Sequence, residues 1–111
     1  MIGAERGFAE RGAEIGWVEA FLEYAAPEAL LGQPGYPNAH EALAGTGHQG
    51  RLLYWWPAFA AIARSGDIGF TTGPFSMDQA RTPVGQYFTI WRRQPDGRWK
   101  WIYDGGFGPI S

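Results

Sequence analysis

The chain contains no cysteine, which excludes disulfide bonds, cysteine-ligated metal sites and a thiol nucleophile. It also has little net charge, because nine Lys and Arg against eleven Asp and Glu give −2 at pH 7. This balance gives no electrostatic reason to expect nucleic acid or an anionic membrane surface as a partner. Long apolar runs are absent as well, so we expect no membrane-spanning segment.

The start of the sequence lacks a basic segment followed by an apolar core, which is the pattern of a signal peptide. The compartment stays open on this basis: cytoplasmic for the chain as written, or periplasmic if a signal peptide has been removed. The composition is ordinary for a soluble globular protein, with 45% hydrophobic and 18% charged residues among 111. This length predicts one domain over residues 1–111, with a single core.

The first part of the sequence has a helical pattern. Apolar residues at helical spacing predict helical structure over residues 4–26. Gly12 and Gly16 weaken this pattern, so the segment forms either two helices or one bent helix. Residues 28–31 lead into a short strand or a turn, and a short helix is expected over residues 39–44 because Asn38 can cap its first turn.

The rest of the sequence has a strand pattern. We expect strands over residues 52–64, 68–77, 85–94 and 98–106. Pro57 removes a ladder donor within the first of them, which implies a sheet edge or a bulge there. Helices followed by an antiparallel meander are typical of an α+β fold. We expect a cone, in which a curved antiparallel sheet wraps around the N-terminal helices and encloses a pocket.

The last two strands form a hairpin closed by a Pro-Asp-Gly turn at residues 95–97. Regular pairing across this turn places Trp91 opposite Trp101 on one face and Phe88 opposite Asp104 on the other. Both faces are largely apolar, so both sides of the sheet should be covered. The pattern leaves open which face lines the pocket and which meets another subunit, and that choice decides whether Asp104 faces a ligand.

Four segments of the sequence resemble one superfamily. They are Ala4-Glu-Arg-Gly-Phe8, Gly16-Trp-Val-Glu-Ala-Phe21, Ser65-Gly-Asp-Ile-Gly-Phe-Thr-Thr-Gly-Pro74 and Trp91-Arg-Arg-Gln-Pro-Asp-Gly-Arg-Trp-Lys100. Together they resemble bacterial proteins of the nuclear-transport-factor-2-like superfamily, and within it the SnoaL-like, DUF4440-type group of unknown function. The resemblance implies a cone-shaped α+β domain that is commonly dimeric through the outer face of its sheet.

This superfamily includes ketosteroid isomerase, scytalone dehydratase, polyketide cyclases and limonene epoxide hydrolase, alongside binding domains without catalysis, so the resemblance does not select a function. Ketosteroid isomerase uses a carboxylate base and two acidic hydrogen-bond donors. By the resemblance, the positions of these three groups fall near Phe8, Gly32 and Thr89, and none of the roles is kept. We therefore expect no steroid isomerisation by that mechanism.

Few residues are candidates for acid–base chemistry. Asp104 is one, because a carboxylate within an apolar strand is costly or titrates high unless it is paired, for example with Arg92. His40 and His48 titrate near neutrality, although both also fit solvated surface positions. We take Asp104 and His40 as the candidate catalytic residues. A metal site is not expected, because Glu41 is the only further ligand close to the histidines.

Five aromatic residues are candidates for binding an apolar ligand: Tyr54, Trp56, Tyr87, Trp91 and Trp17. The alternative is that these rings fill the cone and a dimer interface. We therefore expect a homodimer that binds a small apolar molecule without a cofactor, with catalysis left open. The second hypothesis is a cofactor-independent isomerase, dehydratase or cyclase that acts on a small hydrophobic cyclic substrate.

Overall fold

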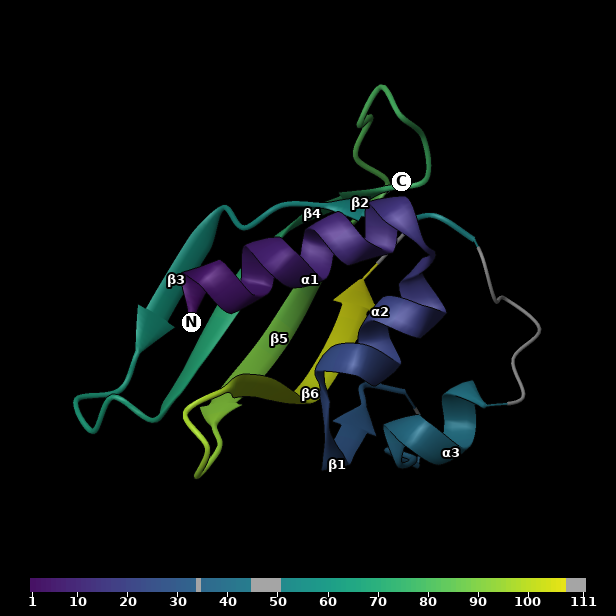
Figure 1. Ribbon diagram of the computed structural model, residues 1–111. Coiled ribbons are helices and arrows are strands. Elements are labelled where there is room, and N and C mark those ends of the chain that lie inside the picture. Colours follow the sequence, from purple (N-terminus) through teal and green to yellow (C-terminus); the bar gives the residue numbers. More distant parts are fainter. Residues whose placement is uncertain (34, 45–50, 108–111) are drawn as a thin grey trace.

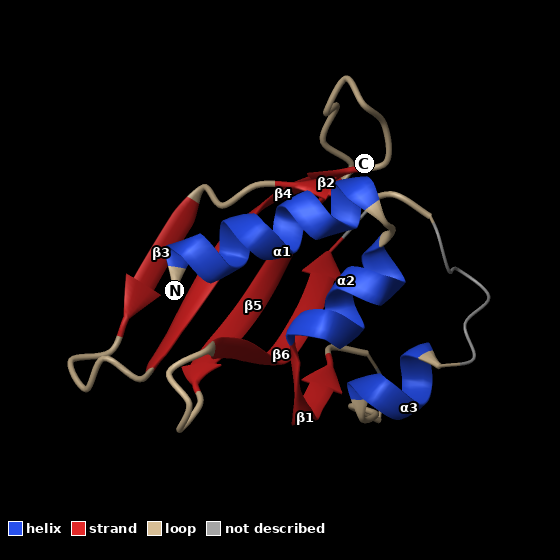
Figure 2. Ribbon diagram, in the orientation of Figure 1, coloured by secondary structure: helices blue, strands red, loops and turns tan. Residues whose placement is uncertain are grey.

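The computed structural model describes residues 1–33, 35–44 and 51–107 as a curved sheet with helices packed against it (Figures 1 and 2). Helices α1 (Ile2–Glu14) and α2 (Trp17–Tyr24) lie across one face, and α3 (Ala39–Leu43) lies beside the first strand. Gly16 separates α1 from α2 with a φ of 117°, a backbone conformation that residues other than glycine rarely adopt. The predicted helical segment therefore divides into two helices, and it ends at Tyr24 rather than at residue 26.

Within the described residues, six strands form one sheet in the order β1-β6-β5-β4-β2, and β3 also pairs with β4. Their bounds are β1 Ala25–Leu31, β2 Tyr54–Trp55, β3 Phe59–Ile62, β4 Ile68–Ser76, β5 Gly85–Arg93 and β6 Trp99–Phe107. The two edges of the sheet do not pair with each other in the part of the chain that is described, so the curved sheet stays open. Among the described helices, none combines the length and the apolar character needed to cross a membrane.

The expectation of a purely antiparallel sheet is wrong at one edge, because β1 runs parallel to β6. The register of this pair shifts between Ala25 and Leu30, so buried and exposed residues do not alternate along β1. An alanine-rich segment without alternation does not look like a strand in the sequence. This explains why β1 was predicted in part as the end of a helix.

The strand predicted over residues 52–64 is also interrupted, and β2 and β3 take its place. Pro57 lies between them and has no N–H group to donate to the ladder of β4. Across from this break, β4 contributes Gly73, where an added Cβ would lie 2.1 Å from the carbonyl oxygen of Trp56. Gly73 thus lets the irregular backbone around Pro57 approach β4 closely.

A β-bulge in β6 changes which side chains share a face of the closing hairpin. Trp91 pairs with Trp101 as predicted, but the register then shifts by one residue, and Thr89 pairs with Asp104. One additional residue on a strand turns every side chain beyond it to the opposite face. The predicted pairing of Phe88 with Asp104 is therefore wrong. Asp104 lies instead on the inner face, together with the two tryptophans.

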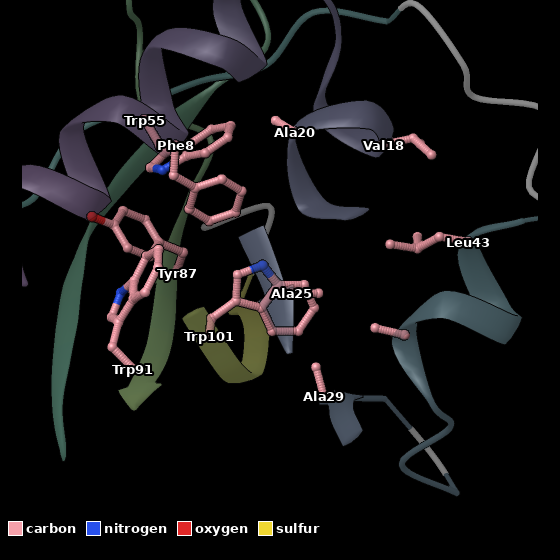
Figure 3. Close-up of a cluster of buried hydrophobic side chains, with 11 residues drawn as sticks. Phe8, Val18, Ala20, Ala25, Ala29, Leu43, Trp55, Tyr87, Trp91 and Trp101 are labelled. Carbon is pink, nitrogen blue, oxygen red and sulfur yellow. The ribbon is translucent and has the colours of Figure 1, made fainter. Parts of the chain in front are cut away.

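The core lies between α1, α2 and this inner face (Figure 3). Phe8 of α1 is 1% exposed and stands at its centre. Its ring centroid lies 4.7 Å from that of Trp55, 5.6 Å from that of Trp91 and 5.1 Å from that of Phe21. Tilted and edge-on contacts of this kind add to the free energy gained from burying apolar area. The aromatic cluster thus fixes α1 and α2 on the sheet.

Replacing Phe8 should be far more damaging than replacing an exposed apolar residue. We expect Phe8→Ala to lower the free energy of unfolding by about 3–5 kcal/mol, because it leaves a cavity among packed rings. Met77→Ala, at a side chain that is 62% exposed, should change it by less than about 1 kcal/mol. Denaturant unfolding of both variants measures the difference. Equal losses would contradict this account of the core.

Candidate ligand-binding site

A cavity of about 640 Å³ opens between α2, α3, the ends of β1 and β6, and the strands behind them. Its volume lies within the range of about 300–1,000 Å³ that is typical of small-molecule pockets. Most of its wall is apolar, and aromatic rings dominate it: Trp17, Phe21, Trp55, Phe75 and Tyr87. An apolar cyclic molecule would find ring faces and edges on several sides here.

Asp104 contributes an acid to the cavity wall and is 7% exposed. Its Oδ2 accepts one hydrogen bond, from Oγ1 of Thr89 at 2.9 Å. Arg92, a partner that the sequence suggested, forms an ion pair with Glu28 instead. Burial raises the pKa of Asp104 well above its usual range, the Thr89 hydroxyl partly opposes this shift, and the nearby Glu5 adds to it. The Asp104 carboxyl therefore keeps its proton to a higher pH than an exposed Asp.

A second acid, Glu5 of α1, lies fully buried behind the cavity wall. Its Oε2 accepts from Nε1 of Trp55 at 3.0 Å, and its Oε1 accepts from the hydroxyl of Thr71. The Thr71 oxygen in turn accepts from Nε1 of Trp91 at 3.1 Å, so its own hydrogen is available for Glu5. Burial raises the pKa of Glu5, and these hydrogen bonds oppose the rise. This network ties α1 to β2, β4 and β5.

Tyr87 of β5 lies near both acids. Its ring lines the cavity, and its hydroxyl lies at the end of the ring nearest α1 (Figure 3). The hydroxyl is buried without a hydrogen bond of good geometry within the described part of the chain. Burial raises the pKa of Tyr87, and the charges of Glu5 and Asp104 raise it further. Three weakly acidic groups thus gather between α1 and the inner face of the sheet.

The sequence interpretation missed Glu5 entirely, although the sequence carries a signal for it. Glu5, Phe8 and Gly12 follow one another at intervals of three and four residues, and all three are buried. Such spacing places them on one face of a helix. A glutamate on the same stripe as a buried phenylalanine is therefore a candidate for a buried, hydrogen-bonded acid.

Of the predicted site residues, the structure brings Asp104, Tyr87 and Trp17 together in the wall of the cavity. Trp91 is fully buried behind that wall and donates to Thr71. Direct contact of these residues with a ligand stays a prediction.

The other two predicted aromatics, Tyr54 and Trp56, line a separate groove of about 430 Å³ beside α1. The guanidinium carbon of Arg81 lies 5.6 Å from the ring centroid of Tyr54 and 5.7 Å from that of Trp56. Cation–π contacts at such distances hold Arg81 over the two rings. A ligand role for Tyr54 and Trp56 would therefore belong to this groove, and it also stays a prediction.

His40 lies apart from the cavity wall. Its Nε2 lies 3.2 Å from the carbonyl oxygen of Ala26, to which a protonated Nε2 donates, and this contact links α3 to β1. A catalytic role for His40 stays untested, and His48 lies outside the described residues. Within those residues, no three His, Asp or Glu side chains are placed to hold a metal ion.

No family model and no curated protein sequence matches the chain. Solved structures match it in fold. An NTF2-like protein of unknown function from Pseudomonas putida has a TM-score of 0.67 at 12% identity, over 98% of this chain and 84% of that one. A Parabacteroides distasonis protein assigned provisionally as a ketosteroid isomerase has a TM-score of 0.66 at 16% identity, over 95% and 82%. The epoxide hydrolase/cyclase-like enzyme SalBIII, of pyran ring formation in salinomycin, has a TM-score of 0.62 at 16% identity, over 97% and 89%.

Helices packed inside an open, curved, mixed sheet define an α+β cone with a cavity. The chain has the nuclear-transport-factor-2-like fold, and the resemblance predicted from its sequence is confirmed at that level. The finer SnoaL-like, DUF4440-type assignment stays a prediction. Because identities this low establish the fold alone, the function has to be argued from the cavity and its acids.

The two buried acids predict an unusual dependence of stability on pH. Asp104 and Glu5 have higher pKa values in the folded chain than when exposed, so folding binds protons between about pH 4 and the folded-state values. The free energy of unfolding should therefore fall as pH rises through this window. Asp104→Asn should flatten the fall by up to about 1.4 kcal/mol per pH unit, the value for one proton.

Denaturant unfolding at a series of pH values measures this slope for the wild type and for Asp104→Asn. Glu10→Gln removes one exposed carboxyl from α1 and controls for the change in net charge. The wild-type free energy of unfolding could instead stay flat or rise over this window, with the same slope in Asp104→Asn. Asp104 would then titrate as an exposed acid, which would contradict the account of its burial.

Proposed function

We propose that the chain is a binding domain for a small apolar molecule, which occupies the cavity and is oriented by Asp104. The observation that carries this proposal is an acid in an aromatic wall with one hydrogen-bond donor, Thr89, and no ion pair in the described part of the chain. Leaving a polar group buried with unused hydrogen-bonding capacity is costly. A ligand that bonds to the free side of the carboxyl removes this cost.

The chemistry of the wall defines the ligand further. A protonated Asp104 donates a hydrogen bond, so its natural partner is a carbonyl or hydroxyl oxygen on the ligand. The rings of Trp17, Phe21 and Trp55 offer apolar area to the cyclic body of a ligand. Binding of this kind needs no cofactor.

A second function has one observation in its favour. The raised pKa of Asp104 moves this acid towards the range in which a carboxyl exchanges protons with a substrate near neutral pH. The chain would then be a cofactor-independent isomerase, dehydratase or cyclase acting on a small hydrophobic cyclic substrate. SalBIII, described as epoxide hydrolase/cyclase-like, shares the fold. Steroid isomerisation does not follow, because Phe8, Gly32 and Thr89 occupy the positions expected for its three groups.

Two matched probes test the role of Asp104. Fluorenone is a planar ring ketone, and fluorene has the same rings without the oxygen. We expect the wild type to bind fluorenone about tenfold more tightly than fluorene, because only the ketone accepts a hydrogen bond from Asp104. Asp104→Leu should lose this preference, whereas Asp104→Asn keeps an N–H donor and should retain most of it. Quenching of tryptophan fluorescence measures each affinity.

Equal binding of the two probes by the wild type would contradict the orienting role, and no binding of either would contradict the proposed function. The same variants separate binding from catalysis once a substrate is found. Loss of turnover in Asp104→Asn with retained binding supports the enzyme, and unchanged turnover contradicts acid–base catalysis by Asp104.

We propose that a second copy of the chain covers the outer face of the sheet. Phe59, Phe70 and Phe88 form a row across β3, β4 and β5 on this face, with ring centroids 5.8 and 5.0 Å apart. Phe59 is 59% exposed, and Ile68, which shares this face with Phe70 on β4, is 38% exposed. A contiguous apolar row of this kind is typical of a protein interface. Two copies that bury it would form a homodimer.

A charge in this row should prevent association. We expect the wild type to sediment as a dimer and Phe59→Glu as a monomer at the same concentration, because the carboxylate would be buried without a partner. Met77→Glu places the same charge on an exposed apolar residue outside the row, and it should leave the dimer intact. Sedimentation velocity distinguishes the species. A wild type that is monomeric at all concentrations would refute the homodimer.

A further inference from the structure

The cavity has an exposed mouth and a buried interior, which the exposure of its lining residues distinguishes. Gln33, Arg51 and Met77 line the cavity and are exposed, so they mark the side of the cavity that faces solvent, called here its mouth. Trp55 and Asp104 line it and are buried, at 4% and 7% exposure. A ligand that fills the cavity therefore meets Asp104 at its inner end and the exposed residues at its outer end.

Arg51 gives the mouth a positive charge. It is the single cationic residue among those that line the cavity in the described chain, and Asp104 is the single acid. Its carbonyl oxygen accepts from the backbone N–H of Trp17 at 2.8 Å, which fixes the Arg51 backbone at the start of α2. The backbone that carries the Arg51 side chain is thus held beside the cavity by a main-chain hydrogen bond.

Among the described residues, the guanidinium of Arg51 has no acid to pair with. Other arginines form ion pairs on the surface, such as Arg11 with Glu23 at 3.1 Å and Arg92 with Glu28. Within the described residues, no acid lies within ion-pair distance of Arg51. Its charge therefore remains available to a molecule that enters the cavity.

We propose that the ligand is a monocarboxylic acid with an apolar ring body and a carbonyl or hydroxyl group at the far end, an inference that rests on the proposed function. Its carboxylate pairs with Arg51 at the mouth, its rings lie between Trp17 and Trp55, and its far oxygen accepts from Asp104. A wholly neutral ligand would leave the Arg51 charge unused, although it would fill the same apolar space.

A carboxylate fits the mouth better than a phosphate ester does. The guanidinium group presents paired N–H donors that match the two oxygens of a carboxylate. One arginine balances one negative charge, whereas a phosphate dianion would leave a second charge beside an apolar cavity. The net charge of the chain, −2, also disfavours the approach of a dianion.

Two probes that differ in one charge test this inference: fluorenone carboxylic acid and its methyl ester. Because Arg51 is exposed, its ion pair is worth little, and we expect the wild type to bind the acid about three- to tenfold more tightly than the ester. Arg51→Gln should reduce acid binding to the level of the ester and leave ester binding unchanged. The preference should also shrink as salt is raised, because salt screens an exposed pair.

Arg64→Gln is the matched control, since it removes an exposed arginine near the turn between β3 and β4, away from the cavity. It should keep the wild-type preference. If the wild type binds acid and ester equally, or if Arg64→Gln loses the preference as Arg51→Gln does, the assignment to Arg51 is overturned while the binding function stands. If neither probe nor fluorenone binds, the proposed function fails and the assignment fails with it.

Discussion

The β-bulge in β6 is the constraint on which the site depends. Between Trp101 and Asp104 the ladder with β5 shifts by one residue, so both side chains point to the inner face. With regular pairing, Asp104 would stand beside Phe88 on the outer face, and the cavity would have no acid in its wall. The bulge thus combines an aromatic core and a carboxyl on one side of a single strand.

The two inner acids have different surroundings, and this difference separates structure from function. Glu5 is enclosed and receives hydrogen bonds from Trp55 and Thr71, so its carboxyl is occupied in joining α1 to the sheet. Asp104 accepts only from Thr89 in the part of the chain that is described, and it borders the cavity. Buried polar groups are stable when their hydrogen bonds are satisfied. Glu5 meets this condition within the chain, whereas for Asp104 the proposed ligand would complete it.

The sequence predicts the class of fold because turns, glycines and alternating apolar residues report local structure. It identifies Asp104 as the acid of interest and Trp17 and Tyr87 as lining aromatics. It does not predict which face Asp104 occupies, because no residue type in this part of the sequence signals the β-bulge. The parallel pairing of β1 is hidden for a similar reason, since its alanines do not alternate. Glu5 was recognisable only from its place on the buried stripe of α1.

The central claim is that the carboxyl of Asp104 faces the cavity as a neutral hydrogen-bond donor. Its carbon NMR signal, assigned by comparison with Asp104→Asn, can be titrated with and without fluorenone. The account predicts a midpoint well above the value of about 3.9 for an exposed Asp, and a further rise when the ketone binds, since binding favours the protonated form. A midpoint near the exposed value that does not respond to fluorenone would contradict it.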